Sequence, residues 1–549
     1  MDPQENIKPD HSNLHTRLNP EKTYFLFGGG VGRFGQNFTI FHHNGATLWV
    51  DTGAGFPAYD QPGLQRTIPS YEIVKKFPPS VIVLTHAHED HIGSFAFLYD
   101  FIPVNTPVYA SPFTLSLLKT RLKELDLDFN RFSFRIVNQN AMFQEGPFRL
   151  SSFFMPHSIP QTFSIGIETQ KGEKIYFSSD FKIHGTEKRH SPKDIKKYGP
   201  VDYLFCDSTG SLSSGSAPDE TEVVKGLEKT IRNWPGRIFI TTFSSQIERI
   251  RYIYEIAERT GRPVGIRGRS IRVHLQAAFE SEEFPKPSMR LNNPSPQNAK
   301  AIWIVAGCQA DEGSSFRRLA ENELAKLHCS SKDLLIYSGS IIPSNTEYVF
   351  EALNNIAARG TPIVGIADEH PVVHTSGHAR KDDLRKLIDW VKPGMVIPVH
   401  GDPIHFQGVA ELVSKSTPVK ILKEACLYEL SSEIPRVTSF DALPGLVEPG
   451  ELHFETSLYR HRKSLSISGI CNVVIQEEGW QLIRIQYVGT GTSEFIEKHI
   501  PALTTRIKDV LKARATSQSI NVNKKLQQKI AKINLDLLQK NPFINLIWI

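Results

Sequence analysis

The strongest constraint on this chain is an apolar run that ends directly in metal-binding side chains. Val81–Leu84 is rich in β-branched residues, and the polar stretch Thr85–Gly93 that follows it holds three histidines and two carboxylates. This pattern predicts a buried strand that ends in a loop. The loop brings imidazoles and a carboxylate to one point at the C-terminal edge of the strand. These groups together suit zinc or a similar first-row divalent ion.

The spacing inside this loop predicts two ions. His86 and His88 project to the same side of an extended segment, whereas Asp90 and His91 can open the following helix and face a second ion. A solvated histidine-rich loop is the alternative. Four ligands at His-x-His-x-Asp-His spacing seldom occur in such loops, so the pattern favours a metal site.

Three further ligand candidates, His157, Asp180 and His400, also follow predicted strands. Each alone would more often be a structural histidine or a turn aspartate. Their shared placement and the need for more ligands make them one set. Asp180 is the natural bridging group, because a carboxylate can bind one metal with each oxygen. Asp51 follows a strand too, and is predicted to orient a ligand imidazole, with a plain turn aspartate as the alternative.

The bulk properties predict a soluble, cytoplasmic protein of several domains. A chain of 549 residues exceeds one core, and its net charge of +5 is small for that length. Residues 1–20 contain no signal-peptide pattern, and no apolar run approaches the length of a membrane span, so no membrane partner is expected. The cysteines are dispersed and odd in number, which favours reduced thiols. They are Cys206, Cys308, Cys329, Cys426 and Cys471.

The rhythm of the sequence changes along the chain. Residues 23–180 contain short strands and Gly-rich turns, which predict a sheet-on-sheet core with outer helices. Residues 201–366 alternate strands and helices, which predicts a second unit with a parallel sheet. The stretch 431–449 has the composition of a linker. Residues 450–549 are expected to form a small α+β domain with helices at 493–514 and 523–539.

The C-terminal region is basic. Residues 501–549 hold nine Lys or Arg against two Asp, so they suit a polyanion, or else form a solvated helix face.

Ten short segments together resemble a known family. They are Gly28–Gly32, Gly35–Asn37, His86–Gly93, Pro156–Pro160, Ser179–Lys182, Asp207–Thr209, Gly268–Ser270, Ser340–Pro343, His374–Ala379 and Pro398–Asp402. The chain resembles the metallo-β-lactamase superfamily and, more narrowly, the ribonuclease J family of β-CASP nucleases. It departs from that family's pattern at Gly32–Gly35, Phe243–Gln246 and Gly307–Glu312.

The resemblance implies an α/β fold with three parts. A metallo-β-lactamase αββα sandwich would be split between residues 1–207 and 367–430. A β-CASP α/β domain would be inserted at 208–366. A linker at 431–449 and a small α+β domain at 450–549 would follow.

The resemblance also implies roles for individual residues. One ion would be held by His86, His88 and His157, the other by Asp90, His91 and His400, and Asp180 would bridge them. Two divalent ions are expected, with zinc as the first choice and manganese as the alternative. Asp90 and His378 would be catalytic. The substrate would contact the residues Phe243, Ser244, Ser245, His374, Thr375, Ser376, Gly377 and His378.

The activity so implied is a metal-dependent ribonuclease. It would act in the 5′→3′ direction on 5′-monophosphorylated RNA in RNA processing and decay, with endonucleolytic capacity. Its partners would be RNA, a second copy or three further copies of itself, and other RNA-decay proteins. One alternative is another β-CASP nuclease that cleaves DNA or processes RNA 3′ ends. A small-molecule metallohydrolase is disfavoured by the large insertion, and a non-catalytic scaffold subunit by the complete ligand set.

Overall fold

A computed structural model describes most of the chain. The described residues are 18–56, 66–184, 192–284, 293–342, 345–366, 371–440, 444–448, 451–453, 470–476, 481–488, 493–512, 526, 528–530, 532–534 and 543–548. They form two compact units, one of residues 1–55 and 68–442 and one of residues 56–67 and 443–549. Each unit is described by itself.

The first unit contains an eight-stranded sheet in the order β20-β19-β1-β2-β3-β5-β6-β7. Its strands are β1 Thr23–Gly29, β2 Phe38–His43, β3 Ala46–Val50, β5 Val81–Leu84, β6 Pro107–Ala110, β7 Ser133–Ile136, β19 Cys426–Glu429 and β20 Arg436–Ser439. The predicted strand Val81–Leu84 is confirmed as β5, and all four of its side chains are buried.

A six-stranded sheet packs against it, in the order β18-β12-β11-β10-β9-β8. Its strands are β8 Met142–Glu145, β9 Phe148–Phe154, β10 Phe163–Thr169, β11 Lys174–Phe177, β12 Val201–Asp207 and β18 Pro393–Val399. The two inner faces share one core, in which the rings of Phe25 and Phe205 lie 5.3 Å apart, edge to face. Pairing of buried aromatic and aliphatic faces is the main stabilising term of such a sandwich.

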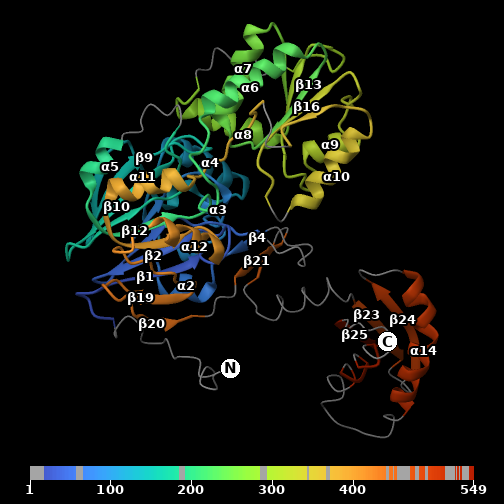
Figure 1. Ribbon diagram of the computed structural model, residues 1–549. Helices are drawn as coiled ribbons and strands as arrows, with labels where there is room; N and C mark the ends of the chain where they lie inside the picture. The colour runs from blue at the N-terminus through green and yellow to red at the C-terminus, as the bar shows by residue number, and fades with distance from the viewer. Residues whose placement is uncertain are drawn as a thin grey trace. The chain divides into compact units, whose positions relative to one another are not determined.

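The side chains of β12 alternate between the core shared by the two sheets and an outer layer of helices. Tyr203 and Phe205 point into the shared core, while Leu204 and Cys206 point outward against helices. The helices on that outer face are α5 Pro192–Tyr198, α11 Lys381–Val391 and α12 Pro403–Leu412. Figure 1 shows them over the six-stranded sheet. The αββα sandwich that the sequence predicted is therefore confirmed.

The inserted segment forms a parallel five-stranded sheet in the order β14-β15-β13-β16-β17. Its strands are β13 Ile238–Thr242, β14 Val264–Arg267, β15 Ile302–Val305, β16 Leu334–Ser338 and β17 Ile363–Val364. The helices α6 Glu220–Asn233, α7 Ile247–Arg259 and α8 Arg269–Glu280 cover one face, and α9 Ser315–Ala320 and α10 Thr346–Ala357 cover the other (Figure 1). The parallel sheet predicted from strand–helix alternation is confirmed.

The second unit contains two small sheets. Strands β24 Gln481–Val488, β23 Ile470–Gln476 and β25 Phe543–Trp548 form one, and β22 Glu451–His453, β21 Gly445–Glu448 and β4 Arg66–Ile68 form the other. Helix α14 spans Ser493–Lys512 and so confirms most of the helix predicted at 493–514. The helix predicted at 523–539 falls partly outside the described residues.

The stretch 431–449, expected as a linker, contains two strands. β20 pairs with β19 and so extends the eight-stranded sheet, and β21 belongs to the second unit. Strand β20 is short, polar and at a sheet edge, so it carries little of the alternation by which a strand is recognised. The domain boundaries themselves stay predictions.

Two other sequence predictions can be compared with the structure. Cys206, Cys308, Cys329 and Cys426 are buried free thiols, in agreement with the expected absence of a disulfide frame among them. In the described part of the chain, no helix is both long and apolar enough to cross a membrane.

Candidate active site

The carboxyl ends of several strands converge on one cluster of histidines and aspartates. Parallel strands β11, β12 and β18 are neighbours, so Asp180 just beyond β11, Asp207 at the end of β12 and His400 after β18 come together. In the facing sheet, β5 ends just before His86. Side chains at the carboxyl ends of strands are the usual position for a site in an α/β protein.

The first group of four ligands is the set His86, His88, His157 and Asp180, whose candidate ligand atoms lie within 4.8 Å of one another. His88 Nδ1 is 3.1 Å from both His86 Nε2 and His157 Nε2, and Asp180 Oδ2 is 3.7 and 3.6 Å from those two nitrogens. Ligands of a tetrahedral zinc lie roughly 3.3 Å from each other, given bonds of about 2.0–2.1 Å. The four atoms therefore have the spacing that a first-row ion requires.

The second group is the set Asp90, His91, Asp180 and His400. Asp180 Oδ2 is 3.3 Å from His91 Nε2, and His400 Nε2 is 3.3 Å from Asp90 Oδ2. Asp90 and His91 lie on helix α3, Glu89–Ile92, as predicted. Both groups contain Asp180, so the structure brings all seven predicted ligands together with this carboxylate between them.

In three of the histidines, the ring N–H that points away from the cluster donates a hydrogen bond to an oxygen held in place by the fold. Thr85 Oγ1 donates to the Asp51 carboxylate at 2.9 Å, so it accepts from His86 Nδ1 at 3.1 Å. His157 Nδ1 donates to the Gly377 carbonyl at 2.7 Å. His91 Nδ1 donates to Asp51 at 2.7 Å, the contact predicted for this aspartate. In the neutral rings of His86 and His157 the other nitrogen keeps a lone pair that points into the cluster.

The remaining two histidines also have a partner on one ring nitrogen, which for His400 is another member of the cluster. His400 Nδ1 donates to Asp180 Oδ1 at 2.8 Å, and His88 Nε2 faces the Ser245 hydroxyl at 3.1 Å. Ser245 belongs to the inserted unit, so that unit supplies the outer partner of one predicted ligand. Metal-binding histidines generally have such a partner, which fixes the tautomer and the orientation of the ring.

The electrostatics differ between the two groups. Burial lowers the pKa of His86 and His157 well below the usual value and that of His88 to about 4, so these rings are neutral. Burial also opposes the charged form of His91 and His400. Asp180 and its neighbouring carboxylates outweigh that effect, raising the pKa of His91 and bringing that of His400 to about 10.

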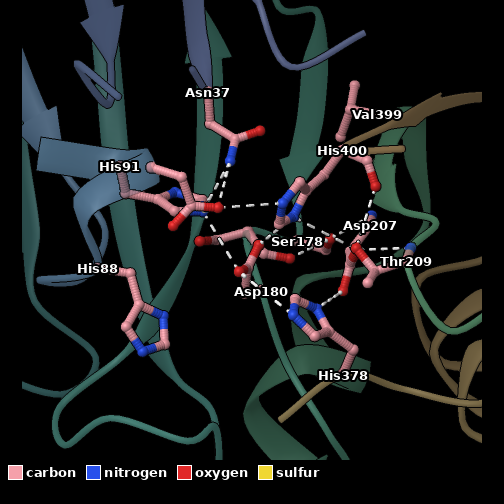
Figure 2. Close-up of polar contacts among 12 residues, drawn as sticks. Asn37, His88, His91, Ser178, Asp180, Asp207, Thr209, His378, Val399 and His400 are labelled. Atoms are coloured by element: carbon pink, nitrogen blue, oxygen red, sulfur yellow. Dashed lines mark hydrogen bonds and ion pairs between the residues drawn. The ribbon is translucent and has the colours of Figure 1, made fainter. Parts of the chain in front are cut away.

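His378 lies beside the cluster, as Figure 2 shows, and Asp207 holds it there. Its Nδ1 donates to Asp207 Oδ2 at 2.9 Å, which leaves Nε2 directed toward Asp180 Oδ2, 3.9 Å away. The sequence predicts no role for Asp207, although the Asp207–Thr209 segment is one of those that carry the family resemblance. The available signal was its position directly after an apolar strand, the same position that identified Asp180.

Asn37 is a second residue that the sequence analysis did not assign. Its side-chain nitrogen is 3.0 Å from His91 Nε2 and 3.3 Å from Asp90 Oδ2 (Figure 2). It therefore lies directly beside two candidate ligand atoms of the second group.

The segment His374–His378 passes directly over the first group. Gly377 lies against His157, where an added Cβ would come within 2.7 Å of the ring. The Thr375 hydroxyl donates to the Pro218 carbonyl at 3.0 Å and so points away from the cluster. The Ser376 hydroxyl accepts from the backbone N–H of His378 at 3.2 Å.

The segment Phe243–Ser245 follows strand β13. Phe243 packs on the core of the insert, the Ser244 hydroxyl bonds that of Ser270 at 2.6 Å, and Ser245 faces His88. Of the predicted substrate residues, Ser245, Gly377 and His378 face the metal cluster. The Ser244 and Thr375 side chains bond elsewhere.

The fold and the site define a class, the metal-dependent hydrolases of the metallo-β-lactamase superfamily. Family models match three parts of the chain. They are a beta-lactamase superfamily domain at residues 47–214, a ribonuclease J beta-CASP domain at 235–356 and a Zn-dependent metallo-hydrolase RNA specificity domain at 367–422. The protein accordingly uses divalent metal.

Similar proteins of known family identify one family within this class. The chain is 32% identical to a ribonuclease J of Sinorhizobium meliloti over 414 residues, which cover 72% of each chain. It is 32% identical to one from Thermus thermophilus over 429 residues, covering 74% of this chain and 73% of the relative. A ribonuclease J of Helicobacter pylori is 26% identical over 549 residues, covering 95% and 78%. The chain belongs to the ribonuclease J family.

Similarity to one solved structure supports the fold and carries no information about function. It is a protein of unknown function from Enterococcus faecalis, 18% identical, with a TM-score of 0.52 over 73% of this chain and 98% of that one.

Proposed function

We propose that the protein is a two-metal ribonuclease that degrades RNA from a 5′-monophosphate end in the 5′→3′ direction and can also cut internally. The single observation that carries this proposal is that two of the three four-ligand groups containing Asp180 together hold all seven predicted ligands. One group is His86, His88, His157 and Asp180, and the other is Asp90, His91, Asp180 and His400. Zinc is proposed as the ion, because nitrogen donors dominate the first group and make up half of the second, with manganese as the alternative.

Two ions held there would lower the pKa of a water molecule between them and neutralise charge that develops on a phosphate. The protein's own contribution is orientation. Asp51, Thr85, Gly377 and Ser245 hold four of the imidazoles by their outer nitrogens, so the ligands need no rearrangement when a substrate arrives.

His378 is proposed as the proton donor to the departing 3′ oxygen. Asp207 fixes its Nδ1, so Nε2 is the nitrogen that faces the reacting phosphate. Asp90 would hold the second ion together with His400, since its Oδ2 faces His400 Nε2, and Asn37 lies beside it. Departure of the 3′ oxygen leaves a 5′-phosphate on the product, which is the end that the next cycle would use.

RNA is the proposed substrate. Support comes from the RNA specificity domain matched at residues 367–422 and from the ribonuclease J relatives. The substrate would lie along Phe243, Ser244 and Ser245 on one side and His374, Thr375, Ser376, Gly377 and His378 on the other. A β-CASP nuclease for DNA or for RNA 3′ ends is the competing proposal.

End-labelled substrates test the proposal. RNA carrying a 5′-hydroxyl, 5′-monophosphate or 5′-triphosphate, and DNA of the same sequence, would be digested with zinc, with manganese and with a chelator. Release of labelled mononucleotides from the 5′-monophosphate RNA alone supports the proposal. Equal cleavage of all RNA ends would leave an endonuclease, and preference for DNA would contradict the RNA assignment.

Assembly is a separate proposal. A homodimer or homotetramer, and association with other RNA-decay proteins, follow from membership of the family. Sedimentation of the full chain at micromolar concentration checks the first, and a single monomer mass would contradict it.

A further inference from the structure

A buried cluster of charges lies outside the metal site. Arg249 on α7 and Glu220 on α6 pair at 2.7 Å, and Lys182, after β11, lies 3.4 Å from the same Glu220 oxygen. The side chains of Lys182, Glu220 and Arg249 are 1%, 3% and 0% exposed. Buried charges are costly unless paired and hydrogen-bonded, so a cluster with two cations and one carboxylate is unusual and needs an explanation.

Arg249 makes more contacts than the ion pair requires. Its guanidinium also donates to the Ser338 carbonyl at 3.2 Å, to the Thr375 carbonyl at 3.3 Å and to His374 Nδ1 at 2.8 Å. Two of these acceptors belong to the segment His374–His378. Arg249 therefore connects the inserted unit to the segment that lies over the metal ligands.

The contact with His374 determines its tautomer. A guanidinium is only a donor, so His374 Nδ1 must accept and its proton must be on Nε2. Nε2 then donates to the Ser340 hydroxyl, 2.7 Å away. Burial, followed by the charges of Arg249 and Lys182, keeps the pKa of His374 well below its usual value, so the ring is neutral.

Ser340 is the exposed end of this chain of hydrogen bonds. Because its oxygen accepts from His374, its own proton is free to be donated outward.

We propose that Arg249 is a positioning residue for substrate binding: it fixes His374 as the Nε2–H tautomer and holds the Thr375 carbonyl, so that Ser340 can donate to a phosphate oxygen of the RNA. This inference rests on the proposed function, because it takes an RNA phosphate as the ligand. The competing explanation is that Arg249 only joins α6, α7 and β16 and thereby stabilises the insert.

Three variants separate the two explanations. Arg249→Lys keeps a charge for Glu220 but cannot reach all four acceptors at once. Glu220→Gln disturbs the same buried cluster while leaving the contact between Arg249 and His374. His374→Gln places an amide N–H near the position of Nε2, and this donor does not depend on Arg249.

Arg249→Lys is expected to raise KM for 5′-monophosphate RNA about tenfold, the scale of one lost charge-assisted hydrogen bond, with kcat within about threefold of wild type. Glu220→Gln is expected to lower Tm with KM near wild type. In the His374→Gln background, Arg249→Lys should change KM less than about twofold. Metal content by mass spectrometry should equal that of wild type in every variant.

Equal KM changes for Arg249→Lys with and without His374→Gln would overturn the proposal, as would an unchanged KM in Arg249→Lys. If the wild-type protein does not hydrolyse RNA, the proposed function is wrong. The tautomer of His374 can then still be tested by itself. In ¹⁵N-histidine-labelled protein, the signals lost in His374→Gln must come from a ring protonated on Nε2 only. A ring protonated on Nδ1, or on both nitrogens, would overturn the inference.

Discussion

Two parallel strand edges in this molecule carry side chains of opposite character. Strands β11, β12 and β18 of the six-stranded sheet lead into Asp180, Asp207 and His400, three ionisable groups that meet in one cluster. Strands β13 and β16 of the inserted sheet lead into neutral residues, Phe243–Ser245 and Gly339–Ser340. The same topological position therefore provides metal chemistry in one sheet and hydroxyl donors in the other.

This comparison shows where each of the two sheets places its charged side chains. The charges of the metal-binding edge, although buried, gather in the ligand cluster, where ions and phosphate would compensate them. The insert instead buries the Arg249–Glu220 pair, and Arg249 contacts His374, which in turn contacts the exposed Ser340. Binding and chemistry should accordingly respond to different substitutions.

The largest effect is expected at the charged edge, from Asp180→Asn. This substitution removes the carboxylate that both ligand groups share, so kcat should fall by more than about 100-fold, the upper range for loss of an outer partner alone. Both bound ions should be lost on dialysis, as measured by mass spectrometry. Asp389→Asn, on the exposed face of α11, is the matched control. Retention of two ions by Asp180→Asn would contradict the shared-ligand arrangement.

His378→Ala should have the next largest effect and should separate chemistry from metal binding. Loss of the proposed proton donor is expected to lower kcat about 100-fold or more while the ion content stays that of wild type. Asp207→Asn should show a smaller loss, because the ring remains but is held less firmly. His328→Ala, at an exposed histidine, controls for removal of an imidazole. If His378→Ala also loses metal, the residue is a ligand instead.

Ser245→Ala tests whether the neutral edge reaches the metal site. It removes the hydroxyl that faces His88 Nε2, so the affinity for the first ion should fall about tenfold in a competition titration with a chelating dye. Ser244→Ala is the control, because that neighbouring hydroxyl bonds Ser270 and does not touch His88. Equal affinities in the two variants would mean that the insert contributes nothing to metal binding.

The smallest effect on turnover is expected from Glu220→Gln, whose main effect is on stability. Burial opposes ionisation of Glu220, but Arg249 and Lys182 hold its pKa below the ordinary value. A carboxylate with a depressed pKa stabilises the fold above its unfolded pKa, and this contribution disappears as pH falls through the folded pKa. The variant should lose about 1–3 kcal/mol at pH 7. The gap in thermal stability from wild type should close below about pH 4, and a gap that does not vary with pH would contradict this.

Much of the metal site could be predicted because its signals are local. His86, His88, Asp90 and His91 lie in one loop, and the partners His157, Asp180 and His400 each follow a strand. Asp207 carries the same signal, because it ends the apolar strand β12, yet no role was predicted for it. Strand β20 could not be predicted from its polar sequence, because an edge strand exposed on both faces shows no alternation of apolar and polar side chains.

Arg249 could not be predicted from the sequence. It lies between Ile247 and Ile250 on an amphipathic helix, where an arginine is usually expected at the solvent-facing boundary. Only the tertiary structure brings Glu220 and His374, from segments 29 and 125 residues away, to opposite sides of its guanidinium. The contact of Ser245 with His88 depends in the same way on docking of the insert.

The separation of His157 from Gly377 has a consequence for synthesis. The outer partner of a ligand in the first group lies 220 residues after that ligand, and His400 of the second group is later still. A ribosome therefore completes the whole inserted sheet before either group of ligands is properly held. We therefore expect that a chain still being made lacks nuclease activity, including toward the messenger that encodes it, until residue 400 has emerged and folded back.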